Sequence, residues 1–222
     1  MSILDIEHGT NVLDINCEAG EGSILANILR RYIVGNCKTW RPIAFQFRND
    51  NPDSIGANSA VISNNIIESF MKFQSSFLKL DFEIDVADQD LYYEIYKFNN
   101  TFTSKDLNTS AVKCTPDNVG LLQATNNQDV TFTVYYRKSF GAHSAEDNYD
   151  FIKERKGENF KIDFPTVASV HYAERRCVSY TVDSLDTKDI IHMSMTGCPN
   201  PEQLIEEAKS HIINSIQNLE IK

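Results

Sequence analysis

The sequence predicts an α+β protein in which strands and helices alternate along the chain. Short runs of alternating apolar and polar residues recur from residue 11 to residue 197, and this period of two predicts strands. Other segments, the most regular of them near the two ends of the chain, repeat apolar residues every three or four positions, which predicts amphipathic helices. The 222 residues are enough for one large domain or two smaller ones.

The first informative segment, residues 11–36, predicts a strand, a turn and a helix. The alternation in NVLDINCE favours a strand, and the glycines of AGEG favour a turn. Ser23 is a suitable N-terminal cap for the helix, and Gly35 or Asn36 can end it in the left-handed conformation. One face of this helix is apolar and contains Ile24, Leu25, Ile28, Leu29, Tyr32 and Ile33.

The middle of the chain predicts mainly strands. A strand is expected over residues 39–48, and the turn-rich residues after it indicate a break in the topology near residue 49. Apolar spacing favours a helix over residues 66–80, whereas the polar residues 147–163 are expected to form a loop. Further strands are predicted within residues 80–98 and 119–140, each holding a pair, and over 166–173, 175–183 and 189–197.

The end of the chain predicts a second long helix. Asn200 is a suitable cap, Pro201 fits the first helical position, and Gln203 stands where a capping-box side chain is expected. The apolar stripe of this helix runs through Leu204, Ala208, His211 or Ile212, Ser215 or Ile216, and Leu219.

Composition and charge exclude several classes of protein. The net charge is −10, which is the opposite of the basic surface expected of a protein that grips nucleic acid by itself. No apolar run approaches the roughly 18 residues of a membrane span, and the N-terminal residues do not resemble a secretory signal. The five cysteines contain no C-x-x-C pair, so neither a disulfide framework nor a structural zinc site is indicated. We therefore expect an intracellular protein in a reducing compartment, without a cofactor.

Candidate sites are few. AGEG lacks the Lys-Ser/Thr ending of a phosphate-binding loop, so a plain turn is the better interpretation. His192 lies six residues before Cys198, which leaves a Cys/His-dependent hydrolase as the alternative function, although no orienting Asp or Asn motif accompanies the pair. Arg30 and Arg31 lie mostly outside the apolar face of their helix and by spacing alone predict a solvated surface.

Several segments nevertheless follow one another in the order of a known family. The most specific is SILANILRRYIVGNCKTWRPIAFQFR, with its Leu-Arg-Arg helix and the strand after a proline-containing turn. The others are IIESFMKFQSSFLKL, TSKDL, YYRKSFGAHSAEDN, PTVASVHYA and TGCPNPEQLIEEAKSHIINSIQNL. Together they resemble the assembly subunit of multisubunit DNA-directed RNA polymerases: the N-terminal part of bacterial alpha, the archaeal D subunit and the third-largest subunit of eukaryotic RNA polymerase II.

The resemblance implies a non-catalytic scaffold. Its dimerization domain, a sheet with two packed helices, is expected over residues 1–48 and 177–222, interrupted by an inserted β-rich domain over residues 49–176. Arg30 and Arg31 are expected to face away from the dimer seam, toward a large catalytic subunit. The seam itself is expected to contain Ile24, Leu25, Ile28, Leu29, Tyr32, Leu204, Ala208, Ile212 and Leu219.

The resemblance also implies the partners. These are an alpha-like or smaller paralogous subunit, the large catalytic subunits and a small assembly subunit, with no direct contact to nucleic acid or membrane. Whether the paired subunit is a second copy or a shorter paralogue stays open. Glu146 stands where the family has a lysine, and the cysteine-rich loop of some members is missing, which implies no zinc or iron–sulfur cluster. The remote similarity fits a divergent lineage such as a large DNA virus, for which a cytoplasmic virus factory or the virion is the expected location.

Overall fold

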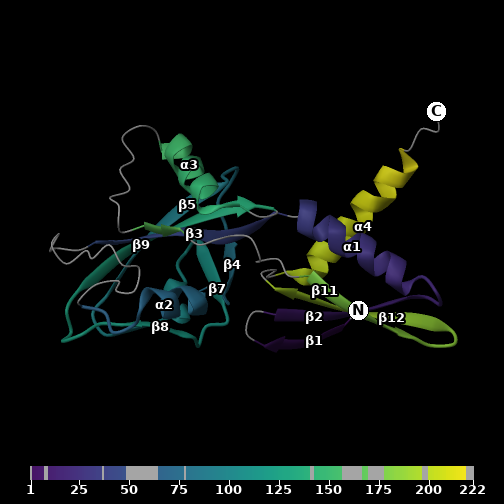
Figure 1. Cartoon of the computed structure of the whole chain (residues 1–222), viewed down its shortest axis with the longest axis horizontal. Coiled ribbons are helices and arrows are strands. Elements are labelled where there is room, and N and C mark those ends of the chain that lie inside the picture. Colours follow the sequence, from purple (N-terminus) through teal and green to yellow (C-terminus); the bar gives the residue numbers. More distant parts are fainter. Residues whose placement is uncertain are drawn as a thin grey trace. The chain divides into compact units, whose positions relative to one another are not determined.

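The chain is an α+β protein, as predicted, and folds as two compact units (Figure 1). One unit combines residues 1–38 with residues 176–222, and the other contains residues 39–175. The structure, a computed structural model, describes residues 2–7, 10–36, 38–48, 65–77, 79–140, 143–156, 167–169, 178–196 and 200–218.

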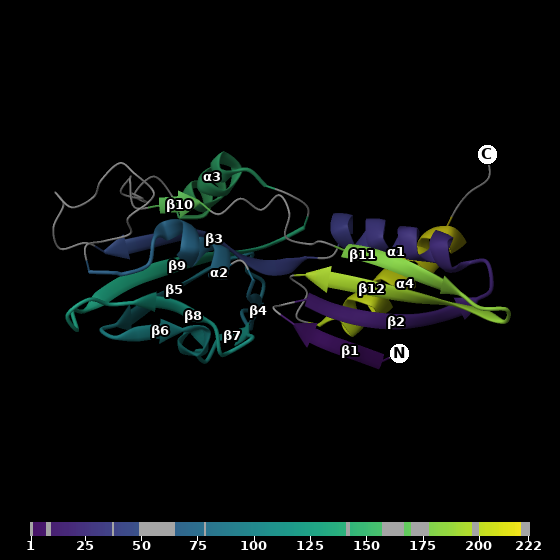
Figure 2. The ribbon, with the colours of Figure 1, turned by 60° about the horizontal axis from the view of Figure 1, so that its bottom comes forward.

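The first unit is an antiparallel sheet with two helices packed on one face (Figure 2). The helices are α1 (Gly22–Asn36) and α4 (Pro201–Gln217). The strands are, in spatial order, β1 (Ser2–Glu7), β2 (Thr10–Glu18), β12 (Lys188–Thr196) and β11 (Val178–Ser184). Because β12 pairs with β2 along its whole length, the two ends of the chain share one sheet.

The core of the first unit lies between the sheet and its two helices. Strand alternation places Leu13 of β2 and Met193 of β12 on the inner face, whereas Asp14 and His192 lie on the outer face. The buried set is Leu13, Ala26, Ile33, Val178, Ile191, Met193, Met195, Leu204, Ile205 and Ala208.

The second unit is built on a larger antiparallel sheet. Its strands are, in order, β5 (Leu91–Phe98), β9 (Val130–Ser139), β3 (Thr39–Arg48), β4 (Asp81–Ile84) and β7 (Val112–Thr115), and β10 (Val167–Ser169) also pairs with β3. The helix α2 (Phe70–Phe77) and the pair β6 (Thr101–Thr103) and β8 (Gly120–Gln123) contribute to a core on one face. The helix α3 (Ala145–Lys156) packs through Ile152 against a separate cluster with Ile43 and Tyr135.

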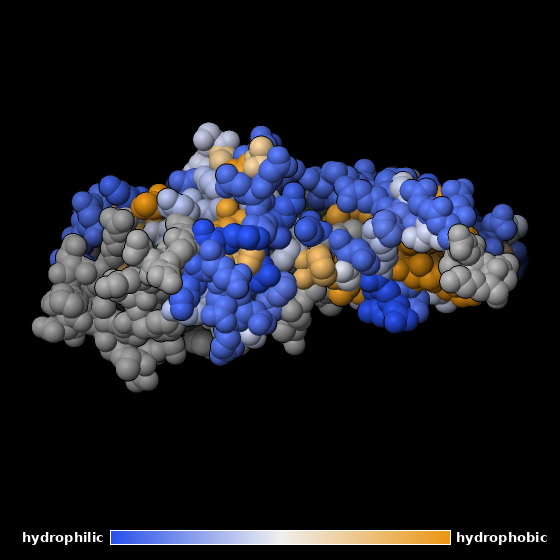
Figure 3. All heavy atoms as spheres, turned by 90° about the horizontal axis from the view of Figure 1, so that it is seen from above, coloured by the Kyte–Doolittle hydropathy of each residue, from blue (hydrophilic) through white to orange (hydrophobic). Residues whose placement is uncertain are grey.

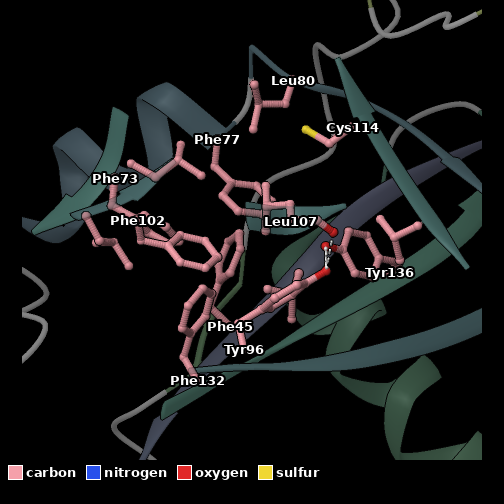
Figure 4. Close-up of a cluster of buried hydrophobic side chains, with 14 of the residues drawn as sticks. Phe45, Phe73, Phe77, Leu80, Tyr96, Phe102, Leu107, Cys114, Phe132 and Tyr136 are labelled. Carbon is pink, nitrogen blue, oxygen red and sulfur yellow. Dashed lines mark hydrogen bonds between the residues drawn. The ribbon is translucent and has the colours of Figure 1, made fainter. Parts of the chain in front are cut away.

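The main core of the second unit is aromatic (Figure 4). Phe132 is fully buried and its ring contacts those of Phe47, Phe73 and Phe102. The hydroxyls of Tyr96 and Tyr136 lie 3.2 Å apart, and Tyr96 also donates to the Leu107 carbonyl at 3.2 Å. These contacts satisfy polar groups whose burial raises the pKa of both tyrosines.

One expected domain boundary lies at a different place. The sequence placed residues 39–48 with the two chain ends, but β3 pairs with β9 and β4 and belongs to the second unit. The first break therefore falls after Lys38 rather than after residue 48, because the partners of a strand decide its unit and they follow it in sequence.

Several elements also differ from the sequence predictions. Residues expected to form a loop contain α3, whose start is closed by a reciprocal pair of hydrogen bonds between Ser144 and Asp147. The helix expected over residues 66–80 is limited to α2. The two strands expected in residues 119–140 are present as β8 and β9, but they pair with β6 and with β3 and β5 rather than with each other. The first strand of the chain, β1, was not predicted.

Candidate functional site

Helix α1 is apolar on two sides. Ala26 and Ile33 are fully buried against the sheet of the first unit. On another side, Ile24 is 65% exposed, Ile28 40% and Leu25 36%. An apolar arc wider than one face of a helix cannot be covered by one sheet, so part of it stays on the surface. Three of the residues expected in a dimer seam therefore lie on the molecular surface, and Leu29 and Tyr32 are half-buried beside them.

Helix α4 extends past the core that supports it. Its last fully buried residue is Ala208, nine residues before the helix ends at Gln217. Beyond that point Ile212 is half-buried, while Ile213 and Ile216 are 46% and 62% exposed. The apolar residues in the first half of α4 thus pack in the core of the first unit, whereas those in its second half are half-buried or exposed.

These burials correct part of the expected seam. Leu204 and Ala208 are buried in the core of the first unit, so they are not available on the surface. The other expected residue near the end of the chain, Leu219, lies outside the described residues. Periodicity identifies the apolar stripe of α4 but does not show that only its first part contacts the sheet. The sequence therefore could not separate the buried residues of the stripe from the exposed ones.

The exposed parts of α1 and α4 border a common groove of about 480 Å³. Tyr32 and His211 both line it, and their ring centroids lie 4.9 Å apart. The residues that line it are Ile28, Arg31, Tyr32, Asn36, His211, Ile212, Ser215 and Ile216. Figure 3, seen from above so that the helices face the reader, shows hydrophobic atoms exposed among hydrophilic ones over the first unit, at the right. We call this region, together with Ile24, Leu25 and Ile213, the α1/α4 surface.

The two arginines of α1 lie in different surroundings. Arg30 is half-buried and donates from Nη2 to Asn27 Oδ1 at 3.4 Å, on the side of the helix away from the groove. Arg31 is exposed and borders the groove, where the sequence expected it on the opposite side. Adjacent residues are 100° apart around a helix, so a neighbouring pair need not share one face.

The start of α1 is fixed by a side chain from the other end of the chain. Asp189 of β12 is 2% exposed, and its Oδ2 accepts hydrogen bonds from the N–H groups of Gly20 at 3.0 Å and Gly22 at 2.9 Å. A carboxylate at this position satisfies unpaired N–H groups and complements the helix dipole. The helix therefore begins at Gly22, one residue before the expected cap Ser23.

The glycine-rich turn before α1 has a structural role. Its backbone N–H groups bind Asp189, and Gly20 adopts a φ of +87°, which favours glycine. The expected left-handed end of α1 is not found, because neither Gly35 nor Asn36 has a positive φ. Likewise, the Asn200 side chain makes no capping hydrogen bond to α4, although Pro201 begins that helix as predicted.

His192 lies in a cluster on the outer face of the sheet. Its Nδ1 lies 2.6 Å from Asp14 Oδ1, and its Nε2 lies 3.1 Å from Asp183 Oδ2. Both ring nitrogens are thus engaged by carboxylates of the neighbouring strands. Cys198, the thiol that the alternative hydrolase requires, lies outside the described residues.

The pKa of His192 should make the stability of the first unit depend on pH. The hydrogen bond to Asp14, and then that to Asp183, raise this pKa above its usual 6.5. The protonated ring therefore stabilises the fold fully below pH 6.5, and this contribution is lost as the pH rises through the folded-state pKa. We expect His192→Gln to lower the free energy of unfolding more at about pH 5.5 than at about pH 8.5, by up to about 1 kcal/mol for such a partly exposed pair, and the melting temperature should fall more at the lower pH.

A double-mutant cycle provides the control for this pH effect. With Asp14→Asn and Asp183→Asn already present, His192→Gln should change the melting temperature equally at both pH values. A pH-independent effect of His192→Gln in the natural sequence would contradict the assignment.

The described parts of the chain were also compared with the requirements of a metal site, a reactive thiol and a membrane span. No group of three or more His, Cys, Asp and Glu side chains there could hold a metal ion. Of the two cysteines whose surroundings are described, Cys114 is buried, which raises the pKa of its thiol, and Cys17 is half-buried. In the same parts, no helix has the length and apolar character needed to cross a membrane.

The α1/α4 surface is thus the strongest candidate site, since it joins exposed apolar side chains from both ends of the chain to a groove bordered by an arginine. Such a surface can bind another protein. A comparison with models of protein families found no match to this chain, and a comparison with curated proteins found none either.

Proposed function

We propose that this protein is a non-catalytic assembly subunit of a multisubunit DNA-directed RNA polymerase. In this role it pairs with an alpha-like subunit through α1 and α4, and the pair seats the large catalytic subunits and a small assembly subunit. The observation that carries the proposal is the α1/α4 surface, where Ile24, Ile28 and Ile216 are exposed on adjacent helices. A contiguous apolar surface of this kind is typical of protein-binding sites.

The length of α4 supports the same role. Among the described residues of α4, none beyond Ala208 is buried, although helices of this size gain most of their stability from packing. Two helices from each partner would supply the missing packing. A stable pair of proteins buries about 1,600 Å² in total, which requires a surface of several turns on both helices.

The organisation of the chain supports it as well. The segments that resemble the polymerase subunits occur in the same order as in that family, and the first unit is built from both ends of the chain. We assign Arg30 to contact with a large catalytic subunit, since it lies on the side of α1 away from the groove. No catalytic step is assigned to this chain.

The proposal is tested by purifying tagged full-length protein from its natural source and identifying what accompanies it. We expect two large polymerase subunits and an alpha-like subunit in stoichiometric amounts. Ile216→Glu should remove them, because a charge in an apolar interface must be desolvated on binding. Ile67→Glu, in the second unit, is the matched control, since Ile67 is 60% exposed and Ile216 is 62% exposed.

Two results would contradict the proposal. One is a purified protein without polymerase subunits. The other is a complex that survives Ile216→Glu as well as it survives Ile67→Glu, because the α1/α4 surface would then not be the interface.

A further inference from the structure

We infer that Tyr32 and His211 form a latch, a contact between rings that holds the exposed half of α4 against α1. The latch keeps Ile212 and Ile216 of α4 on the same groove as Ile28 of α1. The inference goes beyond the proposed function, because it describes a conformational equilibrium of this chain by itself. It follows from where the core stops supporting α4 and from what contacts the helix after that point.

The second half of α4 receives little support from the core of the first unit. Leu204, Ile205 and Ala208 are buried, whereas every described residue of α4 after Ala208 is half-buried or exposed. Helices shorter than about 12 residues are only marginally stable in water by themselves. Residues 209–217 therefore depend on contacts outside the core to remain helical and to stay beside α1.

Tyr32 of α1 offers a firmly held surface for such a contact. It is half-buried and packs against the core cluster of the first unit. Its ring centroid lies 4.9 Å from that of His211, with 38° between the two ring planes. This separation is in the range over which aromatic rings attract each other. Because His211 follows Ala208 by three residues, the contact lies where the support of the core ends.

The ring of His211 is also oriented from its own helix. Its Nδ1 lies 3.2 Å from Oγ of Ser215, about one turn further along α4. Side chains four residues apart lie on one face of a helix, so this hydrogen bond extends the connection from Tyr32 toward the end of α4. Both residues line the groove together with Ile212 and Ile216. If the latch opens, these two isoleucines leave α1 with the end of the helix.

The latch thus determines whether the groove exists before anything binds to it. In the closed form, apolar side chains from both helices border one groove. In the open form, α1 keeps its own exposed side chains but loses the neighbouring wall. A ligand that requires the closed form binds more weakly in proportion to the fraction of molecules that are open.

Hydrogen exchange of the full-length protein, followed by mass spectrometry, measures this equilibrium. His211→Ala should accelerate exchange of the amides of residues 212–217 by about two- to tenfold, the range expected for loss of one aromatic contact. The amides of β12, in the core, should be unaffected. Alanine favours helices more than histidine does, so a change in helix propensity would act in the opposite direction.

Two further variants make the test specific to the ring contact. His211→Phe keeps an aromatic ring against Tyr32 and should retain most of the protection. Lys209→Ala is the matched control, since Lys209 is exposed on the same helix and its ammonium pairs with Glu206 at 3.4 Å. It should leave the exchange of residues 212–217 unchanged.

Two results would overturn the inference. One is an exchange rate that is the same in the natural protein and in His211→Ala. The other is equal acceleration by His211→Ala and His211→Phe, because the ring contact would then not be what holds the helix. The proposed function fails separately, if Ile216→Glu leaves the polymerase subunits bound, since the latch is measured on this chain alone.

Discussion

Replacing Arg41 with methionine should lower the free energy of unfolding of the second unit by about 3–5 kcal/mol, the range for breaking a buried ion pair by removing one partner. Arg41 is 2% exposed and Asp81 is 4% exposed. The guanidinium donates to the Leu80 carbonyl at 3.1 Å and lies 3.5 Å from Asp81 Oδ1. Without it, the buried Asp81 carboxyl loses the positive charge that faces it and has no water to replace that interaction.

The measurement is urea unfolding followed by fluorescence of Trp40, the single tryptophan, which is buried in the second unit. The control replaces both members of the pair, with Arg41→Met and Asp81→Leu together. Because apolar residues of similar volume need no desolvation of charge, the double variant should recover most of the lost stability. If Arg41→Met alone leaves the midpoint unchanged, the pair is hydrated and not buried.

Replacing Gly22 with alanine should cost the first unit about 3 kcal/mol, since it combines overpacking with the loss of hydrogen bonds to a charged group. A Cβ at Gly22 would lie 2.7 Å from Val182 Cγ1 and 2.8 Å from both Cβ and Oδ2 of Asp189. These distances are shorter than van der Waals contact allows. The start of α1 must move away from β11 and β12, and the contact between Asp189 and the helix N-terminus must weaken.

This variant should also weaken the proposed pairing with an alpha-like subunit, because α1 contributes about half of the residues of the α1/α4 surface. Hydrogen exchange of the α1 amides measures the local effect, and the amount of alpha-like subunit that accompanies the tagged protein measures the proposed pairing. Gly35→Ala is the matched control within the same helix, since a Cβ there meets nothing within 4 Å. It should leave stability unchanged or raise it by up to about 1 kcal/mol, as alanine favours helices. Equal effects of the two substitutions would show that Asp189 does not position α1.

The elements that the sequence predicted well are those with strong local signals. Helix α4 begins at Pro201 because proline fits the first turn, and β3 has the predicted bounds because its apolar residues are dense and flanked by turn residues. The α+β class follows from these periodicities. Helix α3 was missed because only Ile152 and the half-buried Tyr149 and Phe151 contribute apolar contacts, so its pattern is weak and its capping pair is the main local signal.

The candidate site was predicted in part. The sequence placed Ile24, Leu25 and Ile28 on one apolar side of a helix; the structure leaves these three exposed, whereas Ile33 of the same predicted face is buried. On α4, the apolar residues of the stripe are buried up to Ala208 and become exposed after it. The sequence of the stripe does not indicate where this change occurs. Ile213 was missed because it lies off the stripe.

The sequence by itself determined the α+β class, the two long helices and the charge of their surfaces, because periodicity, capping residues and composition act over a few neighbouring positions. Only the tertiary structure decided which strands pair, that β3 belongs to the second unit, and where the apolar stripe of α4 leaves its core. It alone brought Asp189 to the start of α1, 167 residues away in the chain. Contacts of this kind depend on burial and on partners distant in sequence, and no local pattern encodes either.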